Sequence, residues 1–326
     1  MSKQNELVQF SRGASGGGSK NIIINGAMNV AQRGTSFSTS TSSIYTLDRF
    51  QSAVGSSFNF DLTLTQSTDA PTGFNNSLKI TPDTTQTPSG GHNGAIRYNI
   101  EAQDLQSLGY GSSDARKMTL SFYVKSNKTG TYSVQLIGYD GQNSCVATYT
   151  IDTSNTWERK TITIDPDTSN AFADDNTLGI LIAWHLACGP SDIVSPSTSW
   201  GVATTGFRAA TGQVNFMDAT ANEWYLTGCQ LEVNDTATDF EVENYGTTLS
   251  KCKRYFQKML NPTYSANGGT NNYLQWWYVP EMRASPTLAG SIGGTNDTSN
   301  TVRAQHYASG SNYAYYDAGV TADAEL

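Results

Sequence analysis

A regular alternation of apolar and polar residues constrains the fold more than any other feature of this sequence. Phe58, Phe60, Leu62 and Leu64 occupy every second position, and polar residues stand between them. This period of two is typical of a β-strand with one buried face. Further short segments of strand-like sequence follow at residues 77–81, 94–101, 117–125, 131–139, 145–151 and 157–164. The pattern predicts a body built almost entirely from strands.

Turn signals and the shortage of helix indicate how these strands combine. Asp140-Gly141 separates two of the segments and is a strong hairpin signal. Residues 178–187, LGILIAWHLA, form a more continuous apolar run, which predicts a central strand covered on both faces. Only residues 101–108 suggest a helical turn, and no strand–helix–strand rhythm occurs. We therefore expect an all-β fold, a two-sheet sandwich of the jelly-roll type.

Charge and hydropathy exclude two classes of partner. The 326 residues include 20 Lys and Arg against 28 Asp and Glu, a net charge of −8, with no basic block. Binding to DNA or RNA requires clustered cations, so we expect no nucleic-acid partner. No apolar run approaches the roughly 20 residues that span a bilayer, and the N-terminus lacks a signal-peptide pattern. We expect no membrane insertion and synthesis in the cytoplasm of the producing cell.

Cysteine and histidine patterns indicate neither a metal site nor a cofactor. The four cysteines are far apart and form no C-x-x-C pair, so we expect reduced, mostly buried thiols: Cys145, Cys188, Cys229 and Cys252. His92, His185 and His306 have no nucleophile or acid at a recognisable catalytic spacing. His185 stands within the apolar run and is predicted to be a core histidine.

Three pairs of carboxylates raise the question of glycoside hydrolysis, which needs two carboxyl groups across a sugar. They are Asp165/Asp167, Asp174/Asp175 and Glu241/Glu243. In loops rich in Asn and Ser, such pairs are more often solvated turns, or occasionally ligands of a structural Ca²⁺. We therefore expect no catalytic residues and no enzyme.

Residues 21–50 and 224–262 contain residue patterns that predict particular local structures. A short buried strand is expected at 22–24, and Arg33, Asp48 and Arg49 are expected to form an ion-pair or hydrogen-bond clamp where it enters the sandwich. Residues 224–228 are expected to close the sandwich, and Phe240 to cap its core. A helix of about three turns is expected after an N-cap at Thr247 or Thr248 and before Asn261-Pro262. Its apolar stripe is Leu249, Cys252, Tyr255, Phe256 and Met259.

The last 65 residues or so are rich in aromatic side chains. A strand is expected at 273–279, and a hairpin around Ser309-Gly310. Aromatic faces beside neutral polar groups suit sugar recognition, and the candidate glycan-binding residues are Tyr273, Trp276, Trp277, Tyr278, Tyr313, Tyr315 and Tyr316. Alternation sends Trp276 and Tyr278 to one face and Trp277 to the other, so one set is in the core. The others form a glycan platform or a contact in a trimer, and the sequence leaves both possibilities open.

The first twenty residues carry a short apolar patch, Leu7, Val8 and Phe10, next to the flexible run ASGGGS. Such a patch suits either docking onto a partner protein or a frayed terminus.

Three blocks of this chain resemble tail-fibre and related virion proteins of tailed bacteriophages. The first is Asn-Gly-x-Met-x-x-Ala-Gln-Arg-Gly (25–34) with Tyr-Thr-Leu-Asp-Arg-Phe (45–50). The second lies within 224–256 and contains Leu-Thr-Gly-x-Gln-Leu-Glu-Val, Ala-Thr-Asp-Phe-Glu and Leu-Ser-x-Cys-x-Arg-Tyr-Phe. The third is Glu-Met-Arg-Ala-Ser-Pro-Thr (281–287). The chain departs from the second block at Cys229 and Asn234, which affects local packing only.

The resemblance implies a virion protein, a homotrimeric tail fibre attached to other phage proteins by residues 1–20 and contacting host-surface polysaccharide. The expected divisions are an attachment arm at 1–20, a jelly-roll sandwich at 21–246, and a helix with a small β module at 247–326. A capsid decoration or head-fibre protein and a glycan depolymerase are the alternatives.

Overall fold

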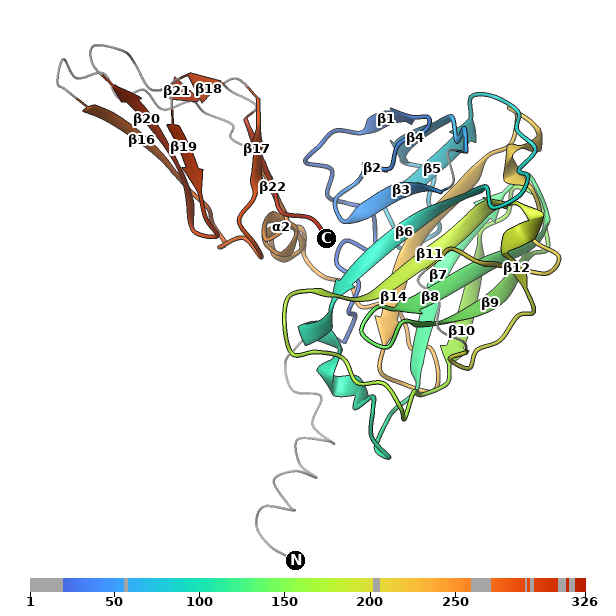
Figure 1. Cartoon of the computed structure of the whole chain (residues 1–326). Helices are drawn as coiled ribbons and strands as arrows, with labels where there is room; N and C mark the ends of the chain where they lie inside the picture. The colour runs from blue at the N-terminus through green and yellow to red at the C-terminus, as the bar shows by residue number, and fades with distance from the viewer. Residues whose placement is uncertain are drawn as a thin grey trace, which may run out of the picture.

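The computed structural model describes residues 20–55, 58–201, 206–258, 271–290, 292–293, 296–309, 315–316 and 320–326. Of residues 271–274, 292–293, 296–298, 305–309 and 315–316 it describes the backbone alone. Figure 1 shows a large body of two β-sheets and a smaller β module that projects from it beyond helix α2 (Tyr245–Lys253).

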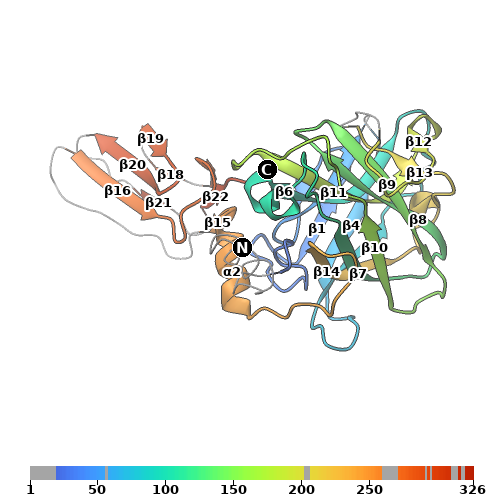
Figure 2. The same cartoon turned by 90° about the horizontal axis from the view of Figure 1, so that it is seen from below.

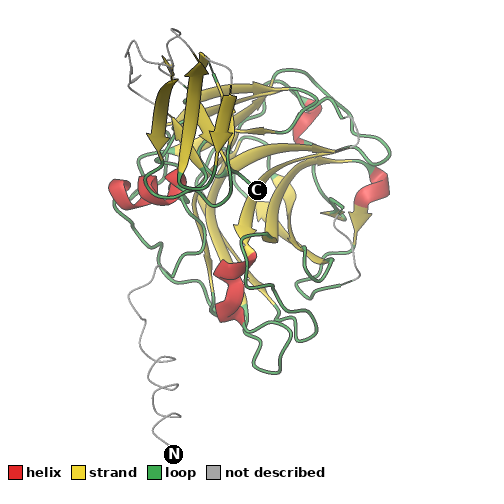
Figure 3. Ribbon diagram, turned by 60° about the vertical axis from the view of Figure 1, so that its left-hand side comes forward, coloured by secondary structure: helices red, strands yellow, loops and turns green. Residues whose placement is uncertain are grey.

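Two six-stranded sheets with antiparallel pairing form the body, and Figure 3 shows how strongly their long strands curve. The first sheet contains, in spatial order, β1 (Ser36–Thr39), β4 (Leu62–Ser67), β5 (Ser77–Pro82), β14 (Trp224–Glu232), β7 (Met118–Ser126) and β10 (Glu158–Ile164). The second contains β2 (Ile44–Tyr45), β3 (Phe50–Gly55), β6 (Asn93–Glu101), β11 (Leu178–Cys188), β8 (Gly130–Gly138) and β9 (Asn143–Ile151).

The chain crosses between the two sheets instead of completing one before the other. Strand β14 lies between β5 and β7, and β11 lies between β6 and β8, so central strands pair with strands far away in the sequence. This wrapping is that of a jelly roll. The predicted all-β jelly-roll sandwich is confirmed.

The core lies between the inner faces of the sheets and is rich in aromatic rings. Trp184 of β11 is fully buried, with ring centroids 6.4 Å from Phe50 and 5.9 Å from Phe122 of the opposite sheet. Strand β11 is central and buried along most of its length, as its apolar run predicts. Asp140-Gly141 joins β8 to β9, and the expected helical turn is a 3-10 helix at Ala102–Leu108.

Two predicted strands differ from the structure. Phe58 and Phe60 are buried, but β4 begins only at Leu62, because its neighbour β1 ends at Thr39, the residue paired with Leu62. Residues 22–24 form no strand, because the backbone turns just beyond them at Asn25, whose φ is 61°.

Short additional elements are 3-10 helices at Pro190–Asp192 and Phe216–Asp218, and the parallel pair β12 (Ile193–Val194) and β13 (Ala209–Ala210).

The four cysteines are free thiols, as expected. Cys145, Cys229 and Cys252 are buried and Cys188 is partly buried. Burial raises the pKa of Cys145 to about 12, so this thiol stays protonated near neutral pH.

His185 is buried in β11, as predicted, and only one of its ring nitrogens has a protein partner. Nε2 lies 3.3 Å from Oε1 of Gln135, while Nδ1 has no hydrogen bond among the described residues. Burial lowers the pKa of His185 to about 3, because desolvation penalises the imidazolium.

The buried imidazole makes folding sensitive to pH. The unfolded chain takes up a proton below about pH 6.5, whereas the folded state does so only near pH 3, so stability falls as the pH falls between these values. From pH 7 to pH 5 we expect His185 to account for a loss of about 2 kcal/mol. Urea unfolding at both pH values checks this, with His185→Gln as the comparison. Equal losses in the two proteins would contradict the prediction.

The C-terminal module contains short sheets with antiparallel pairing. Their strands, in spatial order, are β15 (Phe256–Lys258), β22 (Thr321–Asp323) and β17 (Thr287–Ala289); β16 (Asn271–Trp277), β20 (Arg303–Ser309) and β19 (Asn296–Ser299); and the pair β18 (Ile292–Gly293) and β21 (Tyr315–Tyr316). The hairpin predicted around Ser309-Gly310 is wrong. Strand β20 already pairs with β16 and β19 on its two sides, and β21 pairs with β18.

Helix α2 is shorter and begins earlier than the apolar stripe predicts. Its N-cap is Asn244, whose side chain accepts a hydrogen bond from the Thr247 amide at 2.9 Å, rather than Thr247 or Thr248. The helix ends at Lys253, because the chain then turns into β15 and pairs with β22. Tyr255 and Phe256 are still buried, and Met259 lies outside the described residues.

A buried ion-pair cluster attaches the end of the chain to the sandwich. Arg49 pairs with Glu325, and their side chains are 1% and 3% exposed; Arg33 lies 3.4 Å from Glu325 and 3.0 Å from Asp323. Tyr45 and Asn99 of β6 donate hydrogen bonds of 2.6 and 2.8 Å to the Leu326 carbonyl oxygen. Figure 2 shows the end of the chain returning to the body beside β6.

The clamp expected at Arg33, Asp48 and Arg49 is only partly present, because the two arginines form ion pairs with Asp323 and Glu325 and not with Asp48. The two arginines hold the end of the chain, and Asp48 instead accepts a 2.7 Å hydrogen bond from the Gln32 amide. Their partners lie almost 300 residues away in the sequence, which the local pattern gave no means of identifying.

Candidate functional site

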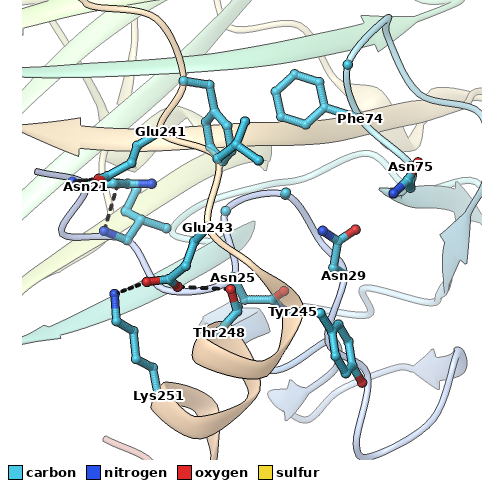
Figure 4. Close-up of a pocket in the computed structure, with 16 residues that line it drawn as sticks. Asn21, Asn25, Asn29, Phe74, Asn75, Glu241, Glu243, Tyr245, Thr248 and Lys251 are labelled. Carbon is cyan, nitrogen blue, oxygen red and sulfur yellow. Dashed lines mark hydrogen bonds and ion pairs between the residues drawn. The ribbon is translucent and has the colours of Figure 1, made fainter. Parts of the chain in front are cut away.

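A pocket of about 240 Å³ lies where the sandwich meets helix α2 (Figure 4). Three segments, 21–29, 73–75 and 240–251, build its walls. Its polar and charged lining is Asn21, Asn25, Asn29, Asn75, Glu241, Glu243, Tyr245, Thr248 and Lys251, and its apolar lining includes Ile23, Phe74, Phe240 and Val242.

The first wall is held tightly against strand β14. The Ile22 amide donates to the Leu231 carbonyl at 2.9 Å, and the Cys229 amide donates to the Gly26 carbonyl at 3.0 Å. Asn21 Nδ2 also donates to the Cys229 carbonyl at 3.1 Å. The backbones are so close at Gly26 that a Cβ there would overlap the carbonyl oxygen of Cys229. Glycine is therefore required at this position.

Two phenylalanines form the aromatic part of the wall. The rings of Phe74 and Phe240 meet edge to face with centroids 5.0 Å apart, and Phe74 also lies 5.3 Å from Tyr123 of β7. Phe74 packs over Gly228, where β14 has an irregular register and a φ of 61°. A Cβ on Gly228 would stand 2.8 Å from the Phe74 ring. The glycine of Leu-Thr-Gly thus gives this ring its place, and Phe240 lines the pocket rather than capping the core.

The charged groups of the pocket are held by the protein itself. Glu243 pairs with Lys251 at 2.5 Å and accepts a 2.9 Å hydrogen bond from Thr248, both on helix α2. Glu241 accepts a 2.8 Å hydrogen bond from the Asn21 amide, and its own amide donates to Gln230 of β14 at 2.8 Å. Figure 4 shows the contact of Glu241 with Asn21 and those of Glu243 with Thr248 and Lys251.

This arrangement suits a small polar ligand with an apolar face. The two phenylalanine rings offer an apolar surface, while asparagine amides, carboxylates and Lys251 offer hydrogen-bond donors and acceptors. Pockets for drug-sized ligands usually measure about 300–1,000 Å³, so a volume of about 240 Å³ suits a single monosaccharide unit. Asn75 and Tyr245 are exposed, Tyr245 by 56% of its surface.

In the other two carboxylate pairs, Asp167 and Asp175 bind their own loops, whereas Asp165 accepts a 2.8 Å hydrogen bond from the Ser199 hydroxyl. Asp167 accepts hydrogen bonds from the Ser169 and Asn170 amides at 2.8 and 3.1 Å, and Asp175 accepts one from the Thr177 amide at 2.9 Å. Among the described residues, no three His, Cys, Asp or Glu side chains gather as a metal site. No helix in the described part of the chain is long and apolar enough to cross a bilayer.

The predicted glycan-binding aromatics lie elsewhere, in the C-terminal module. Alternation along β16 is confirmed, since Tyr278 is buried next to Trp276, with centroids 5.2 Å apart, while Trp277 is 54% exposed beneath Arg303. Tyr278 therefore belongs to the core of the module. The structure describes only the backbone of Tyr273, Tyr315 and Tyr316, and Tyr313, Leu7, Val8 and Phe10 lie outside the described residues.

Sequence reasoning did not identify the pocket. Phe74 stands in a turn at Gly73-Phe74 with no repeat to mark it, and Asn21 and Lys251 are ordinary polar residues in sequence. Glu241 and Glu243 were considered only as a catalytic pair. The available signal was the resemblance to phage proteins, because the blocks 25–34 and 224–256 both supply residues of the pocket.

No protein-family model and no curated protein matches the chain. Among solved structures, it is similar to the enzymatically active domain of tailspike protein 4 of bacteriophage CBA120, with 14% identity over 66% of this chain and a TM-score of 0.33. It is similar to a CBM22-1–GH10 fragment of a Clostridium thermocellum xylanase, with 10% identity over 66% and a TM-score of 0.35. It is also similar to TmCBM61 in complex with β-1,4-galactotriose, with 8% identity over 66% and a TM-score of 0.32.

The chain spans 22% of the first of these proteins, 29% of the second and all of the third. These likenesses are distant, and the assignment of a jelly roll rests on the strand order of the chain's own sheets.

Proposed function

We propose that this chain is a virion structural protein of a tailed bacteriophage, a tail fibre that binds host-surface glycan in the pocket between the sandwich and helix α2. The observation that carries the proposal is the combination, in one pocket, of an apolar aromatic wall with amide and carboxylate groups. Pyranose rings are complementary to such a pocket, because they have an apolar C–H face and a rim of hydroxyls.

The residues that carry the resemblance to phage fibres support this assignment. Asn25, Gly26 and Asn29 come from the first block, and Phe240 and Glu241 come from the second. These segments are about 200 residues apart in sequence and meet at this pocket. The third block also packs nearby, since the Arg283 amide donates a 2.9 Å hydrogen bond to the Arg254 carbonyl.

In the proposed mechanism adhesion is multivalent. One small pocket binds a sugar weakly, but several copies on a particle raise avidity by about 10²–10⁴ without any new contact. The fibre is proposed to be a homotrimer attached to other virion proteins by residues 1–20. Analytical ultracentrifugation tests the trimer, and a monomer would contradict the fibre assignment.

Alanine variants of two aromatic residues test where the glycan binds. We expect Phe74→Ala to weaken binding to host capsule or lipopolysaccharide about tenfold, because it removes half of the aromatic wall, equivalent to about 1.4 kcal/mol. Trp277→Ala, in the C-terminal module, is expected to bind normally if the pocket is the site. Titration calorimetry with both folded variants decides between them. Loss of binding in Trp277→Ala alone would place the site on β16.

Glycan hydrolysis is a second candidate, because Glu241 and Glu243 line the same pocket. Under the adhesion proposal both act as hydrogen-bond acceptors that bind the protein and the sugar. A reducing-sugar assay on host polysaccharide distinguishes the two functions. Sustained release of reducing ends that stops in Glu243→Gln would replace adhesion with hydrolysis. Labelling of the protein on phage particles in micrographs distinguishes a tail fibre from a head fibre.

A further inference from the structure

A second pocket of about 300 Å³ adjoins the first. Its lining is Asn21, Ile22, Ile24, Asp104, Lys251, Arg254 and Tyr255. Asn21 and Lys251 line both pockets. Ile23 lines the first, whereas Ile22 and Ile24 line the second, so the segment 21–24 is the wall between them. Asn21 and Lys251 are therefore the residues placed to contact groups in either pocket.

The second pocket gathers the two cations of this region. Lys251 lines both pockets and Arg254 lines the second, where Asp104 is the carboxyl group in the lining. Lys251 pairs with Glu243 of the first pocket at 2.5 Å, and its side chain is 34% exposed. Positive side chains are scarce in a chain with a net charge of −8, so two cations in one pocket lining form a local cluster.

Arg254 keeps hydrogen-bond donors available for a ligand. Its Nη2 donates to Glu101 at 2.7 Å, and the side chain is 35% exposed. A guanidinium has five N–H donors in a planar fork that matches carboxylate, sulfate and phosphate groups. Glu101 is fully buried, and its other oxygen lies 3.6 Å from Arg283, so two arginines share this one carboxylate.

Asp104 is the one carboxyl group in the lining of the second pocket. Burial, and then the nearby Glu101, raise the pKa of Asp104, while Arg254, Arg49 and Lys251 act in the opposite direction. A raised pKa means that the carboxyl group loses its negative charge at a higher pH than an exposed aspartate. The charge of the second pocket therefore becomes more positive as the pH falls.

We propose that the two pockets together bind an acidic glycan, with a sugar unit in the first pocket and the anionic group of its neighbour in the second, held by Arg254 and Lys251. This inference rests on the proposed glycan-binding function and specifies its ligand class. In this arrangement Lys251 contacts both sugar units, and Arg254 makes the second pocket selective for an anionic group.

An array of matched oligosaccharides tests the proposal. Each pair on the array differs by one carboxylate, sulfate or phosphate group, so the array also distinguishes which anion is bound. Where an anionic oligosaccharide binds, we expect its affinity to be at least about tenfold higher than that of its neutral counterpart. Equal binding within pairs, or binding of neutral members only, would overturn this inference and leave the proposed function standing. Absence of binding to every member would overturn both.

Two variants on the same helical segment assign the selectivity to the pocket. Arg254→Gln retains an amide that can bind Glu101 but removes the charge, and we expect it to lose the preference for the anionic member while it still binds the neutral one. Lys253→Met removes one positive charge from a residue that lines neither pocket, and it is expected to bind as the unchanged protein does. An equal loss of preference in both variants would indicate long-range attraction and contradict a specific role for Arg254.

Discussion

Replacing Gly26 with alanine is expected to destroy the pocket and to destabilise the protein by about 3 kcal/mol. The new methyl group would overlap the Cys229 carbonyl oxygen, which belongs to strand β14 and cannot move without disturbing the first sheet. The segment 21–29 must therefore shift away, and it loses the 3.0 Å hydrogen bond from the Cys229 amide. Urea unfolding measures the stability, and titration with host polysaccharide measures the binding.

Gly246 offers a matched control for this substitution. It lies near the start of helix α2, and a Cβ there would meet only the Asn244 side chain, at 3.5 Å. Gly246→Ala is expected to keep binding and to stabilise the protein by about 0.4–1 kcal/mol, because alanine limits the unfolded chain without strain. Normal stability and binding in Gly26→Ala would contradict the close approach of the two segments.

Replacing Glu325 with alanine is expected to lower the free energy of unfolding by about 3–5 kcal/mol. The change leaves Arg49 buried, 1% exposed, with no carboxylate partner among the described residues. Its remaining contacts include the Asn99 carbonyl, at 2.5 Å, and the rings of Tyr255 and Tyr98, whose centroids lie 3.4 and 5.2 Å from the guanidinium carbon. Desolvation of the unpaired cation then opposes docking of the C-terminal module. Urea unfolding followed by circular dichroism measures the loss.

Asp323 is the control for Glu325, because it pairs with Arg33 at 3.0 Å but its side chain is 39% exposed. Asp323→Ala is expected to cost less than about 1 kcal/mol, as is usual for exposed ion pairs. The double variant Arg49→Met with Glu325→Met should recover most of the loss, because it removes both charges together. A large loss in Asp323→Ala combined with a small one in Glu325→Ala would contradict the assignment of the buried pair.

Several local features of the fold followed from the sequence because short-range physics sets them. The strands from residue 77 to residue 164 appear at their predicted places, since alternation fixes which face of each strand is buried. The hairpin at Asp140-Gly141 follows from turn chemistry. The predictions were wrong where pairing with a distant segment determined the local structure. Helix α2 ended early because β15 pairs with β22, and the predicted hairpin failed because β20 already had two partners.

Reasoning from local sequence patterns could not locate the candidate site. Its residues come from segments separated by up to about 200 positions, and none of them forms a periodic pattern. The aromatic cluster in the C-terminal module attracted attention because its residues are adjacent in sequence, yet Tyr278 serves the core there. The ion pair between Arg49 and Glu325 likewise has no sequence signal, since an isolated arginine near position 50 has many possible partners.

The sequence by itself determined that the chain is all-β and that its body is a jelly-roll sandwich. These properties follow from alternation, turn residues and composition, which act over a few residues at a time. Only the tertiary structure brought Asn25, Phe74, Phe240 and Lys251 into one pocket and placed Arg254 beside it. The reason is physical: which distant segments meet depends on how sheets wrap and pack, and that is a property of the whole chain.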